Sequence, residues 1–321
     1  VNNPCVSAKF GFSQGFQFFD DSFIEREDIS TSNKVRAPEM NAVAIQWLEQ
    51  YWVNAEGEKP RVFLFIYYIE PHVWHNPPAP FNTLVDPDYT GPITPELFGI
   101  GKEAAAGQLS LSERDLQNRL ALYDGEIAYW DSQLPTLISY LSQTGFLQNS
   151  LLIITGDHGE LMGEYGLWTH GTGLQEELLR VPLLMMYPGA IPAGISVSSP
   201  AQMMDIMPTI LDWVNLPIPA ELQAVSLRPL AQGGSQANRP VFSEIDGVTN
   251  PRHWAYWQAP HEDLYAVIQD NWKLVVHADN PSLNELYYLN ANSPYEGENL
   301  IAREVDRADA LRQLIQQWFG K

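Results

Sequence analysis

An aspartate and a histidine that directly follow an apolar run are the residues of this chain best placed to do chemistry. Residues 151–154 are all leucine or isoleucine, and Gly156 then precedes Asp157 and His158. The apolar run predicts a buried strand, and side chains at the carboxyl end of such a strand lie where α/β proteins bind ligands. A carboxylate and an imidazole on this glycine turn therefore predict a site for one divalent cation.

The donor types narrow the choice of metal ion. Oxygen-rich ligation with one imidazole fits Ca²⁺, Mg²⁺ or Mn²⁺ better than a closed zinc site. The alternative for Asp157 and His158 is an ordinary loop with a capping aspartate, and the Asp-His-Gly tripeptide alone does not exclude it. The segments on either side of the tripeptide favour the metal site, because they match one protein family.

Several segments resemble the sulfatases, within the alkaline phosphatase superfamily, and they occur in the family's order. Segments in a fixed order are more specific than any one motif. The resemblance implies an α/β fold: an alkaline-phosphatase-like α/β/α sandwich with a mostly parallel central sheet, plus a small C-terminal α+β subdomain with an antiparallel sheet. The matching segments are residues 10–21, 70–72, 77–81, 122–129, 155–160, 163–170 and 178–184.

The nucleophile motif that this family would carry is absent from the chain. Neither a Cys-x-Pro-x-Arg nor a Ser-x-Pro-x-Arg sequence occurs, and the one cysteine, Cys5, lacks proline and arginine at the required offsets. We therefore interpret Cys5 as an ordinary residue. The resemblance implies an upstream N-terminal section, missing here, that supplies a formylglycine nucleophile and the other protein ligands of the cation. Calcium is the ion that the resemblance favours, with Mg²⁺ and Mn²⁺ as alternatives.

Two histidines match positions of the family that act on the substrate. His170 corresponds to a cationic or proton-donating side chain facing the sulfuryl oxygens, and His72 corresponds to a second such position after another predicted strand. The implied roles are to neutralise charge on the transferring group and, for one of the two, to protonate the leaving alkoxide. An imidazole suits both roles because it titrates near neutral pH. The sequence does not decide which histidine is the proton donor.

Three further side chains are weaker candidates for substrate binding: His75, Trp74 and Trp168. Trp168 and Tyr165 would form a wall for a sugar or an aromatic leaving group, although aromatic side chains near a glycine loop more often pack inside the protein. Glu160 is interpreted as part of the loop scaffold.

The composition limits the class of partner. The chain has 321 residues, 45% of them hydrophobic, which is enough for a substantial core. Its 18 basic and 39 acidic residues give a net charge of −21, which repels nucleic acids and anionic membrane surfaces, so neither is an expected partner. An anionic substrate then requires a cation and histidines that reverse the sign of the potential inside a cleft.

Hydrophobic periodicity and turn residues predict the elements that position these side chains. A capping pattern at Ser110 and Glu113 predicts the start of a long helix that Gly145 ends, and Asp205 is expected to cap a later helix. The helices predicted in this way are 38–54 and 110–145, and the predicted strands are 62–68, 151–155, 181–187, 265–276 and 285–289. The resemblance implies two further helices, at 205–213 and 305–319.

A glycine-rich stretch at residues 232–238 is the best candidate for a linker. It predicts a main α/β domain over residues 1–235, lacking its N-terminal portion, and a C-terminal subdomain over residues 236–321. The subdomain is expected to hold the antiparallel sheet and a closing helix.

The resemblance implies that the complete protein hydrolyses a sulfate ester with metal assistance, and a sulfated carbohydrate is the expected substrate. This chain holds only part of the catalytic groups, so on its own it is expected to be inactive, with its own N-terminal fragment as a candidate partner. One alternative is a phosphodiesterase or phosphonate hydrolase of the same superfamily, and another is a sulfatase-like binding protein without catalysis. Since sulfated polymers are extracellular, a secreted or periplasmic protein is expected.

Overall fold

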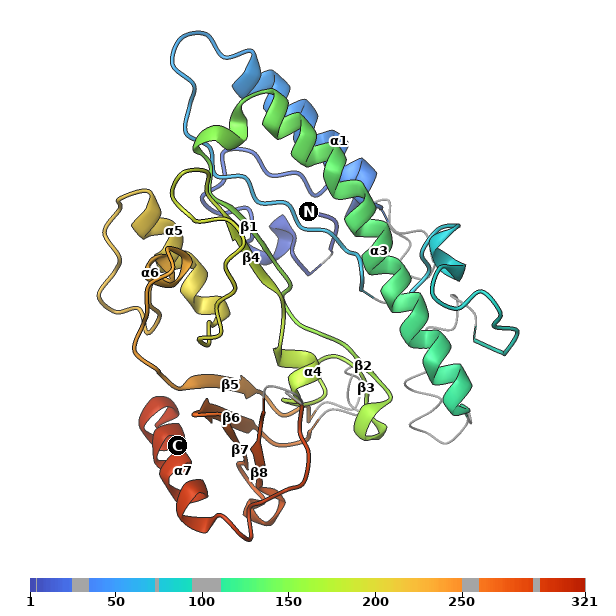
Figure 1. Ribbon diagram of the computed structural model, residues 1–321, viewed down its shortest axis with the longest axis vertical. Helices are drawn as coiled ribbons and strands as arrows, with labels where there is room; N and C mark the ends of the chain where they lie inside the picture. Colours follow the sequence, from blue (N-terminus) through green and yellow to red (C-terminus); the bar gives the residue numbers. More distant parts are fainter. Residues whose placement is uncertain are drawn as a thin grey trace. The chain divides into compact units, whose positions relative to one another are not determined.

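The computed structural model describes residues 1–3, 5–24, 35–72, 75–93, 111–249, 260–290 and 295–320. The chain divides into two compact units, Val1–Phe146 and Leu147–Lys321 (Figure 1). This division falls elsewhere than the boundary expected between residues 235 and 236, which stays a prediction. Among the helices of the described ranges, none is both long enough and apolar enough to cross a membrane.

Two helices dominate the first unit. Helix α1, Ala37–Leu48, continues as a π-helical segment over Glu49–Val53, and helix α3 runs over Glu113–Gln143. Both predicted helices are thereby confirmed, and α1 packs against α3. Apolar side chains that these helices bury include Met40, Ala44, Leu48, Leu137 and Leu141.

The amino end of α3 is capped two residues later than predicted. Ser112 is the N-cap, and its hydroxyl accepts a hydrogen bond from the Asp115 backbone N–H at 3.3 Å. The Asp115 carboxylate accepts in return from the Ser112 N–H at 2.9 Å, which completes a capping box. The predicted pair of Ser110 and Glu113 is wrong, because the same three-residue spacing also fits Ser112 and Asp115, and Glu113 is the first helical residue.

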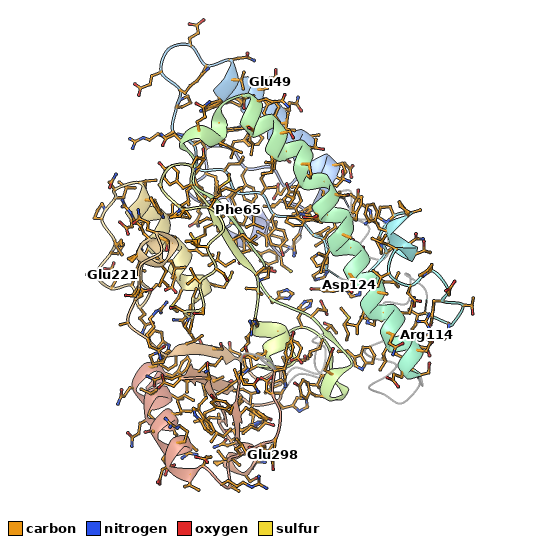
Figure 2. The ribbon with its side chains drawn as sticks, viewed as in Figure 1. Glu49, Phe65, Arg114, Asp124, Glu221 and Glu298 are labelled. Atoms are coloured by element: carbon orange, nitrogen blue, oxygen red, sulfur yellow. The ribbon has the colours of Figure 1, made fainter. Side chains whose placement is uncertain are left out.

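The predicted strand at residues 62–68 is wrong in this structure, which assigns no strand to that segment. Phe63 and Phe65 (Figure 2) are 62% and 50% exposed. A strand of a parallel sheet would instead be buried on both faces. A run of aromatic and aliphatic residues becomes a strand only where another strand pairs with it. That pairing depends on segments far away in the sequence, which a local pattern does not report.

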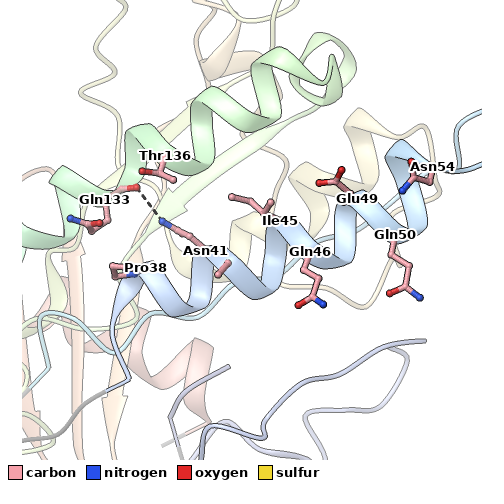
Figure 3. Close-up of a pocket in the computed structure, with 10 residues that line it drawn as sticks. Pro38, Asn41, Ile45, Gln46, Glu49, Gln50, Asn54, Gln133 and Thr136 are labelled. Atoms are coloured by element: carbon pink, nitrogen blue, oxygen red, sulfur yellow. Dashed lines mark hydrogen bonds between the residues drawn. The ribbon is translucent and has the colours of Figure 1, made fainter.

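A groove lies between α1 and α3 in the first unit (Figure 3). The Asn41 side-chain amide donates to the Gln133 carbonyl at 3.1 Å and so joins the two helices. Carboxamide side chains contribute polar groups to a lining that is mostly apolar, and none of the predicted site residues belongs to it. The carboxamide residues are Asn41, Gln46, Gln50, Asn54 and Gln133.

The second unit is of mixed α/β class, and every strand pair in its described part is antiparallel. Strand β1, Leu152–Thr155, pairs with β4, Leu183–Met186, and both confirm predicted strands. Strand β2, Leu161–Met162, pairs with β3, Trp168–Thr169, in a short hairpin. The parallel part of the expected central sheet is not among these described pairs.

The predicted C-terminal antiparallel sheet is confirmed. Its strands join in chain order, and helix α7, Val305–Phe319, packs Leu311 and Ile315 against a core that contains Val267 and Leu274. The predicted strand 265–276 is two strands, because Asp270 and Asn271 take positive φ angles of 54° and 65° and close a two-residue hairpin turn. The strands are β5 Val241–Ile245, β6 Leu264–Gln269, β7 Trp272–His277 and β8 Glu285–Tyr288.

Asp205 is fully buried where the chain enters helix α5. Its carboxylate accepts hydrogen bonds from the backbone N–H groups of Gln202 at 2.8 Å and Val225 at 3.0 Å, and it pairs with Arg239. Asp205 holds the N-cap position of α5, as expected, but its carboxylate makes no capping hydrogen bond to α5 and instead completes a capping box with Gln202 at the preceding 3₁₀ turn. The elements here are η7 Met203–Asp205, α5 Ile206–Trp213 and α6 Arg228–Ala231.

Gly159 brings the turn after β1 against helix α4, Glu176–Leu179. Its N–H donates to the Leu178 carbonyl at 2.8 Å. A Cβ atom on Gly159 would lie 1.8 Å from the Glu177 carbonyl oxygen, so only glycine fits at this position. The turn that ends β1 is therefore held in direct backbone contact with α4.

Replacing Ser112 with alanine should lower the free energy of unfolding by about 1 kcal/mol, because the N-cap of α3 loses its acceptor. Hydrogen bonds, above all with the Ser112 side chain, hold the pKa of Asp115 below its usual value. The stabilisation by this carboxylate is therefore present above the unfolded-state pKa of about 3.9 and is lost as the pH falls through the folded-state value.

Urea unfolding should show that the difference in free energy of unfolding between the wild type and Ser112→Ala becomes smaller as the pH is lowered from 7. Ser142→Ala, at an exposed position in the last turn of α3, is the control and should change stability by less than about 0.5 kcal/mol. Equal losses in both variants would contradict the capping role.

Gly159→Ala should destabilise the second unit by about 1–3 kcal/mol, because its Cβ forces the turn and α4 apart. Gly297→Ala is the matched control, since a Cβ there meets no atom within 4 Å. Thermal unfolding followed by circular dichroism measures both. The same melting temperature for the two variants would show that the close backbone contact does not exist.

Candidate active site

The predicted metal pair lies at the end of β1. Asp157 Oδ1 and His158 Nε2 are 3.9 Å apart, and both side chains are partly exposed. Asp157 Oδ1 also accepts a hydrogen bond from the His158 backbone N–H at 3.1 Å. The other ring nitrogen of His158, Nδ1, is 2.8 Å from the Gly159 carbonyl oxygen. Nδ1 thus carries the hydrogen of a neutral His158, and Nε2 is the basic nitrogen on the side of Asp157.

The distance within this pair fits two neighbouring ligands of one cation. Two atoms that are each about 2.4 Å from a Ca²⁺ ion lie about 3.4–3.9 Å apart at ligand–metal–ligand angles of about 90–110°. The 3.9 Å between Asp157 Oδ1 and His158 Nε2 is at the upper end of that range. Within the part of the chain that the structure describes, no third histidine, cysteine or carboxylate completes a metal cluster. The pair can thus supply two ligands, and the other ligands must come from other groups.

The β2–β3 hairpin brings His170 to the metal pair. The rings of His170 and His158 are stacked, with centroids 4.2 Å apart and an angle of 29° between their planes. Nδ1 of His170 lies 3.2 Å from Oε2 of Glu160, whose side chain is only 3% exposed. A hydrogen on Nδ1 that is donated to this carboxylate fixes the ring and leaves Nε2 as the nitrogen for proton exchange.

Glu160, expected to be loop scaffold, is therefore the partner that orients His170. Ten residues separate the two in the sequence, and only the pairing of β2 with β3 brings them together. The one signal in the sequence is a carboxylate placed directly before the apolar pair Leu161 and Met162. A charged group in such a position is buried only when it has a partner.

Two residues of the hairpin have left-handed backbone conformations that are rare for their types. Tyr165 has a φ of 57° and Thr169 a φ of 63°. A positive φ at a β-branched residue such as threonine is strained, at a cost of about 1–3 kcal/mol. The Thr169 hydroxyl accepts a hydrogen bond from the His170 N–H at 2.5 Å. Strain beside His170 that the hairpin maintains is typical of a functional position.

Tyr165 links the hairpin to the segment around α4. Its one hydroxyl hydrogen is shared between two acceptors, Glu177 Oε1 at 3.3 Å and Glu296 Oε2 at 3.5 Å. Burial and these two carboxylates raise the pKa of Tyr165 above its usual value. Burial also raises the pKa of the Glu177 carboxyl.

The remaining histidine candidates belong to the first unit. The His72 N–H donates to the Ile69 carbonyl at 2.7 Å. His75 is buried, and its ring meets that of Tyr123 edge to face with centroids 5.3 Å apart. Trp74 lies outside the described residues. These side chains and the metal pair are in different units, so their union in one site stays a prediction.

Trp168 lies on β3 opposite Met162 and is 6% exposed. This burial supports the alternative in which the ring packs inside the protein. A substrate wall that includes Trp168 stays a prediction.

Two family models match this chain. The family model described as Sulfatase matches residues 3–216, and one described as N-sulphoglucosamine sulphohydrolase, C-terminal, matches residues 163–318. Arylsulfatase K of Bos taurus is 30% identical over 206 residues, which are 64% of this chain and 37% of the relative. N-acetylglucosamine-6-O-sulfatase of Bacteroides thetaiotaomicron is 28% identical over 193 residues, which are 58% of this chain and 33% of the relative. The chain spans about a third of the length of these curated relatives.

The fold is similar to that of a phosphonate monoester hydrolase from Silicibacter pomeroyi. The TM-score is 0.66 at 26% sequence identity, and the likeness covers 89% of this chain and 60% of that one. It supports the predicted alkaline-phosphatase-like α/β class. The Sulfatase match extends over more than half of the chain and includes Asp157, His158 and His170. This chain belongs to the sulfatase family, within the alkaline phosphatase superfamily.

Proposed function

We propose that the complete protein hydrolyses a sulfate ester with the help of a divalent cation. The observation that supports this most directly is the placement of His170, oriented by a carboxylate, against the Asp157 and His158 pair. Membership of the sulfatase family supports the same reaction class. A sulfated carbohydrate is the proposed substrate, because one relative is an N-acetylglucosamine-6-O-sulfatase.

Asp157 and His158 would hold the cation through Oδ1 and Nε2. When bound, the cation and a formylglycine supply the electrophilic stabilisation and the nucleophile, and sulfatases generally depend on both. Ca²⁺ is the proposed ion because the expected ligands are mostly oxygens, with Mg²⁺ and Mn²⁺ as alternatives.

His170 would give its Nε2 proton to the leaving alkoxide, since Glu160 holds the ring at Nδ1. Before that transfer, a cationic imidazole offsets negative charge on the sulfuryl oxygens. This offset matters in a chain whose net charge is −21. His72 is proposed as the second cationic side chain, and the assignment of proton donor to His170 rests on its carboxylate partner.

Three weaker candidates, His75, Trp74 and Trp168, are proposed as substrate contacts. The nucleophile and the other cation ligands are proposed to come from an N-terminal section of the same protein, because this sequence contains neither nucleophile motif. The chain alone is then expected to be inactive. Because sulfated polymers are extracellular, we propose that the protein is secreted or periplasmic.

Hydrolysis of a phosphonate monoester is the second candidate function. It is favoured by the likeness in fold to a phosphonate monoester hydrolase at 26% sequence identity. The two candidates share the cation pair and differ in the charge and geometry of the group transferred. Substrate preference therefore decides between them.

The complete protein should release sulfate from glucosamine 6-sulfate faster than it cleaves a phenylphosphonate monoester, and EDTA should abolish both reactions. Asp157→Asn keeps the shape of the side chain but removes its charge, so it should weaken Ca²⁺ binding by more than about tenfold in calorimetric titration. Asp270→Asn, in the exposed β6–β7 turn, is the control and should bind as the wild type. Preference for the phosphonate would favour the second function, and chelator-resistant turnover would contradict the cation's role.

His170→Gln in the complete protein should lower kcat for sulfate release by about 10²–10⁴-fold, because the proton donor is lost. The rate that remains should no longer decline at high pH, because that decline requires a donor that loses its proton. His277→Gln is the matched control, since His277 makes a similar contact to Glu262 at 3.0 Å on the C-terminal sheet. Comparable losses in the two variants would refute a specific role for His170.

A further inference from the structure

Strand β7 carries a lysine whose side chain is fully buried. The Lys273 ammonium donates to the Leu174 carbonyl at 2.5 Å, to Glu176 Oε1 at 2.7 Å and to Glu296 Oε1 at 2.6 Å. These three acceptors match the three hydrogens of an ammonium group. None of these four residues belongs to the proposed cation pair or to the proposed proton donor.

This cluster places one ammonium between two carboxylates that are themselves almost fully buried. Removing three charges from water is costly, and apolar side chains of the same volume would often be at least as stable. Such a cluster is therefore better explained by the chain segments that it holds in place than by the stability that it adds. The structure shows which segments these are.

One branch of the cluster leads to His158. Glu176 is the first residue of α4, and its backbone N–H donates to both carboxylate oxygens of Glu296 at 3.1 and 3.2 Å. Two residues later, the Leu178 carbonyl accepts the Gly159 N–H at 2.8 Å. Gly159 directly follows His158, so the position of α4 sets the position of this histidine.

The other branch leads to His170. Glu296 Oε2 accepts a hydrogen bond from the Tyr165 hydroxyl, and Tyr165 lies in the turn between β2 and β3. This turn leads into β3, which His170 directly follows. One carboxylate thus contacts both segments that carry the stacked rings.

We infer that Lys273 and Glu296 are positioning residues of the candidate active site, which hold α4 and the β2–β3 turn so that the His158 ring stacks on the His170 ring. The inference deepens the proposed function, because these two rings are its proposed cation ligand and proton donor. It concerns the placement of the rings, however, and that placement is measurable without substrate or cation.

A second buried ion pair of the same unit provides the comparison. Arg239 pairs with the fully buried Asp205 and joins the segment before β5 to the turn before α5. The Asp205 carboxylate accepts hydrogen bonds from the backbone N–H groups of Gln202 and Val225, which do not belong to the segments around the stacked rings. Loss of this pair should destabilise the second unit without moving the rings.

Labelling the histidine rings with ¹³C at Cε1 allows the test by NMR, because the chain has only seven histidines. The signals of His158 and His170 carry the mutual ring-current shift of stacked rings. Lys273→Met should remove this shift from both signals and leave the His75 signal in place. In the complete protein the same variant should lower kcat for sulfate release by about 10²-fold, as expected for misplaced catalytic groups.

Arg239→Met is the matched control and should lower the melting temperature without moving either ring signal. If Lys273→Met does not fold, Glu296→Gln and Tyr165→Phe carry the test, because the first removes the charge that pairs with Lys273, the second removes the hydroxyl that contacts Glu296, and neither changes the side-chain volume much. Unmoved ring signals in the folded variants, or equal movement in Arg239→Met, would overturn the inference. If the ring signals move in Lys273→Met but the wild-type complete protein releases no sulfate, the inference is upheld and the proposed function is refuted.

Discussion

The candidate site depends on a contact between two backbones that leaves no space for a side chain. Gly159 lies against α4 so closely that a Cβ would overlap the Glu177 carbonyl oxygen. This contact fixes the direction in which the chain leaves β1, and with it the side chains of Asp157 and His158. Since α4 is itself held by Lys273, the geometry at the end of β1 is determined by residues of the C-terminal sheet.

Electrostatics adds a second constraint, because an acidic chain has to accept an anionic group. A net charge of −21 gives a field that repels sulfate esters over most of the surface. Around the candidate site Glu160 faces His170, and Lys273 faces the two carboxylates of Glu176 and Glu296, so that this cluster keeps one negative charge. Binding of a divalent cation to Asp157 and His158 would supply the positive charge that an anionic group requires there.

The sequence predicts those features that depend on neighbouring residues. The position of Asp157 and His158 directly after β1 follows from an apolar run and a glycine turn, α1 and α3 follow from helical periodicity, and α7 is implied by the family resemblance. The capping pair of α3 is missed by two residues because two serines share the same spacing to an acidic residue. Glu160 and Lys273 are missed for a different reason: burial of a charge is decided by its partner, and Lys273 meets Glu176 across 97 residues.

The long separation between Lys273 and its partners also bears on the order of folding. The segments that form β1, β2, β3 and α4 leave the ribosome before β7 exists, and contacts between distant residues form late because closing a long loop costs entropy. The arrangement of His158 and His170 thus becomes complete only when the last quarter of the chain has been made. A nascent chain would hold the rings of His158 and His170 in loose order until the C-terminal sheet is complete.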